Sequence, residues 1–299
     1  MNSLPPLPID FNAPSEWREL DRKALSRTVL LVGATDTGKS TLARWLLEQA
    51  RNRGRTAAWL DGDLGQSSLG LPGTLNFVTV TEEASAPMRR AAFFVGSSSP
   101  KGHMLQVLTG LRRLRDEALC DGADPIFIDT SGLVAEDSGG GALKEWETEL
   151  LLPTAIIALR RGQELTHLLV PWRHDPRFHL QVLPVASGVR RRTPQERSMW
   201  RQQLLRSFFE KTRLLRIGKE QTPIYGWQNA APGCLAGLID RQGLLLGAGV
   251  VRRILSNSLE LLSPHDFSEQ LAIVRLGRLR IDHLTGRELP RNTAPGFED

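Results

Sequence analysis

The sequence has few of the residues that define several common classes of protein. Its two cysteines, Cys120 and Cys234, are too few for a disulfide framework or a cysteine zinc site, and we expect a cytoplasmic location. No apolar run reaches the roughly eighteen residues that a membrane-spanning helix requires, so we expect no membrane association. Residues 1–14 hold four prolines and no basic stretch before an apolar core, so we also expect no signal peptide.

Lysine is also scarce, because arginine supplies 32 of the 38 basic residues. The formal net charge is +5 and the isoelectric point is near 9.7. Guanidinium groups are planar and bind phosphate bidentately, so an acidic partner such as nucleic acid is compatible with this composition. Arginine enrichment also follows from background composition or thermal adaptation, and composition alone therefore leaves the partner open.

One stretch matches a phosphate-binding pattern at every fixed position. The pattern GxxxxGK[ST] and the residue after it are Gly33, Ala34, Thr35, Asp36, Thr37, Gly38, Lys39, Ser40 and Thr41, directly after the apolar run 28–32. In such a loop, backbone N–H groups and the lysine face the phosphates, and the serine hydroxyl binds Mg²⁺. The alternative is a glycine turn with a solvated lysine, which the order of strand, loop and helix disfavours. We expect ATP or another nucleoside triphosphate as cofactor, with Mg²⁺.

Acidic residues follow two further apolar runs. Asp61 and Asp63 come after the run 56–60, and Asp129 ends the run 125–129. The carboxyl ends of strands in an open α/β sheet face the ligand crevice, where a P-loop phosphotransferase needs acids for a metal or for the acceptor's proton. The alternative is that these residues are helix caps or turn residues. We favour the functional interpretation and predict Asp61, Asp63 and Asp129 as metal-site residues, with Asp63 also as a candidate base.

The alternation of short apolar runs with helical patterns predicts an α/β fold. We expect a mostly parallel sheet of the P-loop NTPase type with helices on both faces. Residues 1–27 are expected to form an extended leader, and residues 28–212 the P-loop domain. Closely spaced glycines then predict a small antiparallel β module over 213–299, with a hairpin turn at 240–243.

An arginine-rich segment precedes the predicted β module. Residues 190–206 include six arginines and a single acidic residue, Glu196. A helix is expected from Pro194. Such a helix is usually a solvated face. Late in a P-loop kinase, it is also the pattern of a lid, expected here around 187–206, whose guanidinium groups stabilise the transferring phosphoryl group.

These motifs together resemble the polynucleotide 5′-hydroxyl kinase family, which includes the RNA kinases of pre-mRNA cleavage and of ribosomal RNA processing. The resemblance covers roughly residues 28–285 and rests on GATDTGKST (33–41), DGDLGQ (61–66), PGT (72–74), GSSSP (96–100), FIDTSG (127–132), PTAIIAL (153–159) and the segment 190–206. It implies a minimal kinase that acts on 5′-hydroxyl ends of RNA or DNA.

The resemblance also implies roles for individual residues. Lys39 and Ser40 would hold the triphosphate and Mg²⁺, Asp63 would take the proton of the 5′-hydroxyl, and Asp61 and Gln66 would support the metal and water shell. The lid arginines would be Arg192 and Arg197, with Arg201 as a third candidate, and Gln66, Thr130, Leu133 and Arg201 would lie on the substrate side. Leu133 stands where eukaryotic members usually have a base-stacking tryptophan.

Two other functions remain open from the sequence. A kinase of a small metabolite would use the same loop and acids, and a catalytically silent ATP-binding adaptor of an RNA-processing complex would use only the nucleotide site. A regulatory GTPase is disfavoured, because the chain has no NKxD guanine-reading motif. The sequence indicates no particular protein partner.

Overall fold

The chain divides into two units. The computed structural model describes residues 4, 6–7, 11–20, 25–81, 88–267 and 269–290, so part of the leader expected over 1–27 lies outside the described residues. The first unit comprises residues 1–70, 75–92 and 99–193, and the second comprises 71–74, 93–98 and 194–299. The second unit thus includes the helix that begins at Pro194, whereas the sequence predicts this helix as part of the P-loop domain; the domain boundaries stay a prediction.

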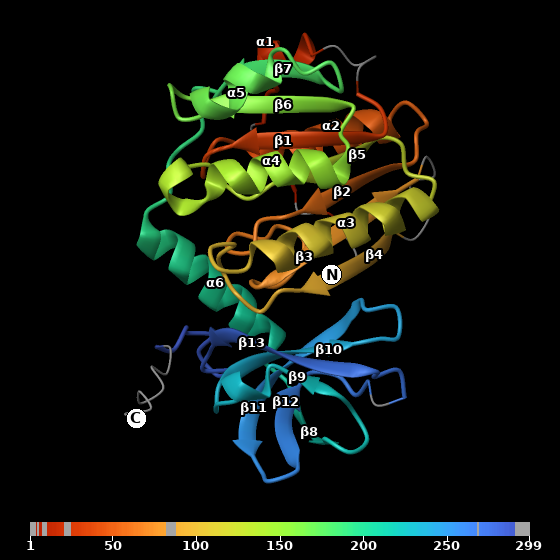
Figure 1. Cartoon of the computed structure of the whole chain (residues 1–299), viewed down its shortest axis with the longest axis vertical. Coiled ribbons are helices and arrows are strands. Elements are labelled where there is room, and N and C mark those ends of the chain that lie inside the picture. Colours follow the sequence, from red (N-terminus) through yellow and green to blue (C-terminus); the bar gives the residue numbers. More distant parts are fainter. Residues whose placement is uncertain are drawn as a thin grey trace. The chain divides into compact units, whose positions relative to one another are not determined.

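A seven-stranded sheet forms the centre of the first unit (Figure 1). In spatial order its strands are β4 (Arg89–Phe94), β3 (Thr74–Val80), β2 (Ala57–Asp61), β5 (Ile126–Asp129), β1 (Thr28–Gly33), β6 (Ala155–Arg160) and β7 (His179–Pro184). The strands from β2 to β7 in this order run parallel, and β3 is antiparallel to β2. The predicted α/β class with a mostly parallel sheet is confirmed.

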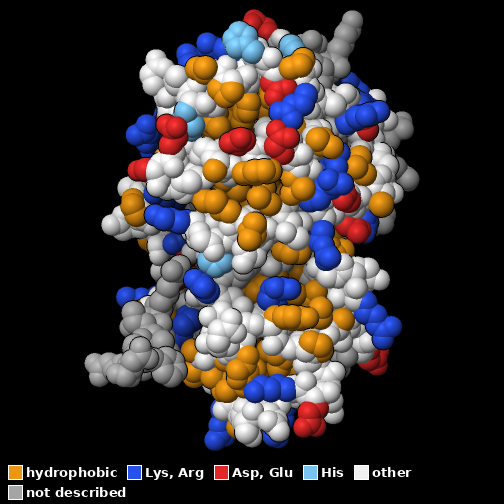
Figure 2. All heavy atoms as spheres, viewed as in Figure 1, with side chains coloured by type: hydrophobic (Ala, Val, Ile, Leu, Met, Phe, Trp, Pro, Cys, Tyr) orange, Lys and Arg blue, Asp and Glu red, His pale blue; other side chains and the backbone are white. Residues whose placement is uncertain are grey.

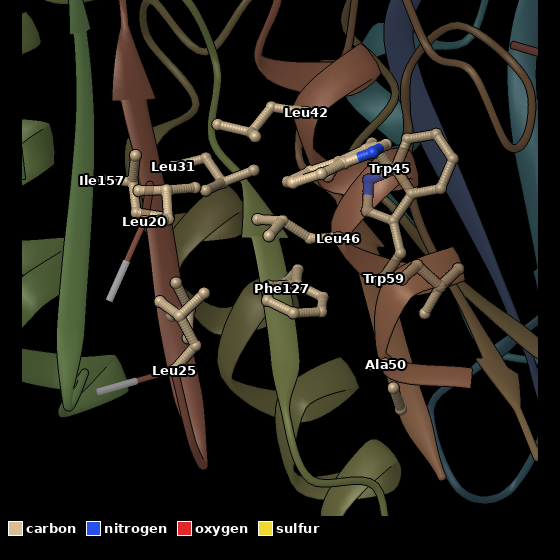
Figure 3. Packing of buried hydrophobic residues seen from close by; sticks show 14 of the residues in the cluster. Leu20, Leu25, Leu31, Leu42, Trp45, Leu46, Ala50, Trp59, Phe127 and Ile157 are labelled. Atoms are coloured by element: carbon tan, nitrogen blue, oxygen red, sulfur yellow. The ribbon is translucent and has the colours of Figure 1, made fainter. Parts of the chain in front are cut away.

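Helices cover both faces of this sheet. They are α1 (Ser15–Arg18), α2 (Lys39–Arg51), α3 (Met104–Cys120), α4 (Gly140–Leu151) and α5 (Thr166–Trp172), with a 3₁₀ turn, η1, at Glu136–Ser138. Leu42 and Leu46 of α2 pack against Leu31, Phe127 and Trp59, which share one face of the sheet (Figure 3). Because side chains alternate along a strand, neighbouring residues of β1, β2 and β5 face the opposite side, where α3 packs on β2 and β5 (Figure 1).

The second unit contains a six-stranded, mostly antiparallel sheet. Its spatial order is β8 (Arg213–Gly218), β12 (Ser258–Ser263), β11 (Leu245–Ile254), β10 (Cys234–Ile239), β13 (Ile273–Arg280) and β9 (Ile224–Tyr225), with a 3₁₀ turn, η2, at Trp227–Asn229. Leu205 of helix α6 (Pro194–Phe208) and the following Phe209 pack on one face of it. The expected antiparallel module and the turn at 240–243, closed by an N–H···O bond from Gly243 to Asp240, are both present.

The surface of the first unit carries an apolar area. Figure 2 shows hydrophobic side chains gathered over α3 and α4, where Leu105 and Trp146 are exposed. No helix among the described residues is both long and apolar enough to cross a membrane.

Candidate functional site

The phosphate-binding loop connects β1 to α2 and is closed by its own side chains. Gly38 at the helix N-cap has φ +90° and Asp36 has φ +57°, conformations that turn successive N–H groups toward one side. Thr37 Oγ1 donates to the Ala34 carbonyl at 2.9 Å. Lys39 is 6% exposed, and its Nζ donates to the carbonyls of Gly33 and Ala34 at 3.0 Å each. The predicted strand, loop and helix are therefore all present.

The acids of β2 and β5 lie beside this loop. Asp61 and Asp129 are register partners on neighbouring parallel strands, and Asp129 also pairs with Leu31 of β1. Gly62 N donates to the Asp129 carbonyl at 2.8 Å. Because β5 lies between β1 and β2, the acid at its end is adjacent to both the lysine loop and the first acid of the DGD segment, as the metal-site hypothesis requires.

Asp129 has the features of a cation ligand. Its side chain is buried, and among the described residues the Ser40 hydroxyl lies beside its carboxylate, although no donor reaches either oxygen with the geometry of a full hydrogen bond. Burial raises its pKa to about 6, while Lys39 and Ser40, and less strongly Lys144, lower it. A buried carboxylate with so little hydrogen bonding is costly unless positive charge lies beside it, and Lys39 supplies part of that charge.

Asp61 instead orders the loop that follows β2. Its Oδ1 accepts from Asp63 N at 3.1 Å, and its Oδ2 accepts from Ser67 Oγ, Ser68 N and Leu69 N at 2.9, 2.5 and 3.1 Å. Burial, and then the charges of Asp129 and Asp63, raise its pKa to about 7. These contacts support a loop-ordering role more than the metal role predicted for this residue.

Asp63 presents a carboxylate at the same edge of the sheet. Its Oδ1 accepts from the backbone N–H groups of Gly65 and Gln66 at 2.9 Å each. Its Oδ2 accepts no hydrogen bond from any residue that the structure describes, and the side chain is half-buried. One oxygen is therefore fixed and the other is available for a substrate proton.

Arg192 connects the phosphate loop to the DGDLGQ segment. Its backbone N donates to Asp36 Oδ2 at 3.0 Å, and its Nη1 donates to Gln66 Oε1 at 3.2 Å. Arg161 also joins the segment 189–192, called here the lid strap, to the phosphate loop, because its Nη2 donates to the carbonyls of Asp36 and Val189 at 2.5 and 3.5 Å. The lid strap thus lies against the loop that would hold the phosphates.

Other predicted site residues have different surroundings. The Thr130 hydroxyl is buried and donates to the Leu31 carbonyl, and Leu133 is half-buried. Arg197 and Arg201 belong to α6 in the second unit, where Arg201 Nε pairs with Glu288 Oε1 at 2.5 Å. The contacts of Thr130 and Arg201 give no support to substrate roles, which stay predictions.

Sequence reasoning missed a buried ion pair on α4. Lys144 Nζ lies 2.9 Å from Glu147 Oε2, and both side chains are at most 1% exposed. Burial lowers the pKa of Lys144 and raises that of Glu147, and the attraction between the pair opposes both shifts. The spacing along the helix could have indicated their burial, because both residues share a helix face with Leu143 and Leu151.

The fold and the site define a P-loop nucleotide-binding protein. A buried strand runs through a glycine loop into a helix, and acids end β5 and β2, the next two strands on one side of it. A family model described as mRNA cleavage and polyadenylation factor CLP1 P-loop matches residues 33–211, so the chain belongs to this family.

Curated relatives agree with this assignment. The chain is 34% identical over 207 residues to a polyribonucleotide 5′-hydroxyl-kinase of Methanocaldococcus jannaschii, a match that covers 66% of this chain and 54% of the relative. It is 24% identical to a protein of the same name from Pyrococcus abyssi, with 85% and 87% covered. It is 31% identical to the CLP1 homolog of Anopheles gambiae, with 68% and 51% covered. The match thus spans about half the length of the first and third of these relatives.

Solved structures support the fold. Clp1p in a complex with Pcf11p superposes with a TM-score of 0.64 at 13% identity, over 85% of this chain and 74% of Clp1p.

Proposed function

We propose that this protein transfers the γ-phosphoryl group of ATP, or of another nucleoside triphosphate, to the 5′-hydroxyl end of RNA or DNA. The observation that carries the proposal is the bridge made by Arg192 between the phosphate loop at Asp36 and Gln66 of the DGDLGQ segment. It gathers phosphate donors, a lid arginine and a carboxylate at one edge of the sheet. The archaeal relatives, which are named polyribonucleotide 5′-hydroxyl-kinases, support the same activity.

The site residues divide the work of the reaction. The backbone N–H groups of 34–41 and Lys39 bind the β- and γ-phosphates. Asp63 Oδ2 takes the proton of the 5′-hydroxyl group. At the same time the hydroxyl oxygen forms a bond to the γ-phosphorus, and the bond between the γ-phosphorus and the bridging oxygen breaks, so that ADP leaves. Before transfer, Arg192 turns its guanidinium from Gln66 to the γ-phosphoryl group, whose charge it stabilises during transfer, and Arg197 stays a second candidate for this role.

The donor set fits Mg²⁺. Ser40 and Asp129 would hold the ion, with Asp129 acting directly or through water, and Mg²⁺ would neutralise charge on the phosphates. Within the described residues no cluster of three or more His, Cys, Asp or Glu side chains has metal-binding geometry. That is compatible with Mg²⁺, which keeps several waters and takes few protein ligands. Asp61 and Gln66 would order the loop and the docked lid.

Label transfer tests the proposal. Protein, Mg²⁺ and γ-labelled ATP are incubated with RNA and DNA oligonucleotides that carry a 5′-hydroxyl, and with the same oligonucleotides carrying a 5′-phosphate as controls. We expect label only on the 5′-hydroxyl ends, with competition from unlabelled oligonucleotides but not from mononucleosides. Label on a small acceptor alone would indicate a metabolite kinase. Unhydrolysed ATP recovered with the purified protein, without transfer, would indicate an adaptor. The cytoplasmic location expected from the sequence belongs to the same proposal.

A further inference from the structure

Helix α4 buries a charged pair that the proposed reaction does not use. Lys144 Nζ contacts both oxygens of Glu147, at 3.2 and 2.9 Å, and the two side chains are 0% and 1% exposed. The same ammonium donates to Ser131 Oγ over a longer distance of 3.4 Å. Lys144 therefore connects α4 to the segment that directly follows Asp129.

That segment supports the phosphate loop. The Thr130 hydroxyl donates to the Leu31 carbonyl at 2.9 Å, which ties the segment to β1. A Cβ built on Gly132 would lie 2.6 Å from Thr35 N, so the backbone at Gly132 touches the loop. Ser131 stands between these two contacts, and Lys144 is its charged neighbour.

Lys144 also interacts electrostatically with groups of the proposed site. Its charge interacts with Asp129 and with Lys39, in addition to Glu147. Glu147 in turn interacts with Lys39. The buried charged groups around the pair thus include the cations Lys39 and Lys144 and the anions Asp129 and Glu147, and Asp129 interacts in turn with the buried Asp61.

Stability alone gives little reason for such a pair. Replacing a buried ion pair by apolar residues of similar volume is often neutral or stabilising, because the desolvation of two charges offsets their attraction. Leu143 and Leu151 on the same face of α4 show that apolar side chains are accommodated there. An apolar replacement would lose the hydrogen bond from Lys144 to Ser131, which connects the pair to the segment beside the phosphate loop.

We infer that Lys144, held by Glu147, is a positioning residue for phosphoryl transfer. By binding Ser131 it fixes the 130–132 turn against Thr35 and keeps Asp129 in place beside Ser40. The inference rests on the proposed kinase function. It assigns the pair a role in ordering the phosphate and metal end of the site, without contact to the substrate.

Three variants and one control test this inference. The double variant K144M/E147M removes both charges with little change in volume, and S131A leaves the ion pair intact but removes its partner hydroxyl. R177M is the matched control, because Arg177 forms an exposed ion pair with Glu149 of the same helix. K144M alone leaves Glu147 buried without its partner and serves as the destabilised reference.

We expect the double variant to melt within about 3 °C of wild type, whereas K144M melts lower. The kcat of the double variant for a 5′-hydroxyl oligonucleotide should nevertheless fall by about tenfold or more, with little change in the KM of the oligonucleotide. S131A should lose kcat by a smaller factor at unchanged melting temperature, and R177M should match wild type. Wild-type kcat in the double variant or in S131A would overturn the inference.

A binding measurement separates this inference from the proposed function. Mg²⁺ should strengthen ADP binding by wild type relative to EDTA, and we expect this gain to shrink about fivefold or more in the double variant and in S131A. An undiminished gain in either variant overturns the inference, whatever the acceptor is. Absence of label transfer by wild type, with the diminished gain still observed, would overturn the kinase function and leave the role of Lys144 supported. A double variant that does not fold would also overturn the inference, because the pair would then be required for the fold.

Discussion

Two carboxylates that stand two residues apart acquire different properties from their surroundings. Asp61 is buried and accepts four hydrogen bonds, so its oxygens are occupied by the loop that it orders. Asp63 is half-buried and accepts through Oδ1 alone from the residues that the structure describes. Such a separation of environments is how a pair of acids divides into a structural member and a reactive one.

Asp129 makes the stability of the metal-free protein depend on pH. Burial raises its pKa from 3.8 to about 6, so the folded state binds this proton more tightly than the unfolded state. The stabilisation is complete below pH 4 and is lost as the pH rises through 6. D129N removes the ionisation, so in EDTA its free energy of unfolding should exceed that of wild type at pH 8 by on the order of 1 kcal/mol more than at pH 5.

Urea denaturation at the two pH values measures this difference. D137N is the control, because Asp137 is an exposed acid of the η1 turn. A D129N difference that is the same at pH 5 and pH 8 would contradict the burial of an ionisable Asp129.

The residues of the phosphate loop could be predicted because phosphate binding requires these residue types at a fixed spacing. Gly33, Gly38, Lys39 and Ser40 match fixed positions, and Asp129 follows an apolar strand. The hydrogen bonds of Asp61 could not be predicted, since its donors come from residues 63–69, whose path depends on the loop as a whole. Lys144 was missed because a lysine three residues before a glutamate usually marks a solvated pair.

At the scale of elements, the turn after β5 packs against the phosphate loop. A Cβ built on Gly132 would lie 2.5 Å from Thr35 Oγ1, closer than real contacts allow. G132A should therefore displace the loop and weaken ATP binding by about tenfold or more, the effect of 1–3 kcal/mol of overpacking. Titration with a fluorescent ATP analogue measures this. G188A is the control, because a Cβ there meets nothing within 4 Å, and equal affinities of the two variants would contradict the proposed packing.

The lid strap gives a second prediction for an element. Arg191 and Arg192 are adjacent and exposed, but Arg192 is the one that bonds to Gln66. R192A should lower kcat by about 10²-fold or more, because a guanidinium at the transferring phosphoryl group is lost. R191A should stay within about twofold of wild type, as surface substitutions usually do. Initial rates at saturating ATP and oligonucleotide compare them, and equal losses would show a general effect of charge.

The central strands could be predicted from their apolar runs, whereas the edge strand β7 could not. β7 (His179–Pro184) carries polar residues and ends in proline, so it gives no continuous apolar signal. It is the last strand of its sheet, and edge strands are commonly polar for this reason. Helix α5 contains Pro171, which obscured its helical pattern.

At the scale of the whole molecule, the positive charge is distributed. Figure 2 shows Lys and Arg side chains spread over the visible face of both units, with acidic side chains among them. A net charge of +5 with this distribution favours attraction to a polyanion through many weak contacts.

Salt should therefore weaken the binding of an oligonucleotide acceptor more than that of a dinucleotide acceptor. The KM of a 5′-hydroxyl oligonucleotide should rise steeply as NaCl is increased from about 50 to 200 mM, because bound counterions are released on association. The KM of a 5′-hydroxyl dinucleotide, which carries a single phosphate, is the control and should rise much less. Parallel behaviour of the two acceptors would indicate that only the terminal nucleotide is bound.

The substitution D63N addresses the proposed chemistry at its reacting atom. The asparagine keeps the size of the side chain and an oxygen for the N–H groups of Gly65 and Gln66, but it cannot take the proton of the 5′-hydroxyl. We expect transfer of labelled phosphate to a 5′-hydroxyl oligonucleotide to fall by about 10²–10⁴-fold, while the Kd for ATP stays within roughly threefold of wild type. Transfer at the wild-type rate by D63N would show that Asp63 is not the base.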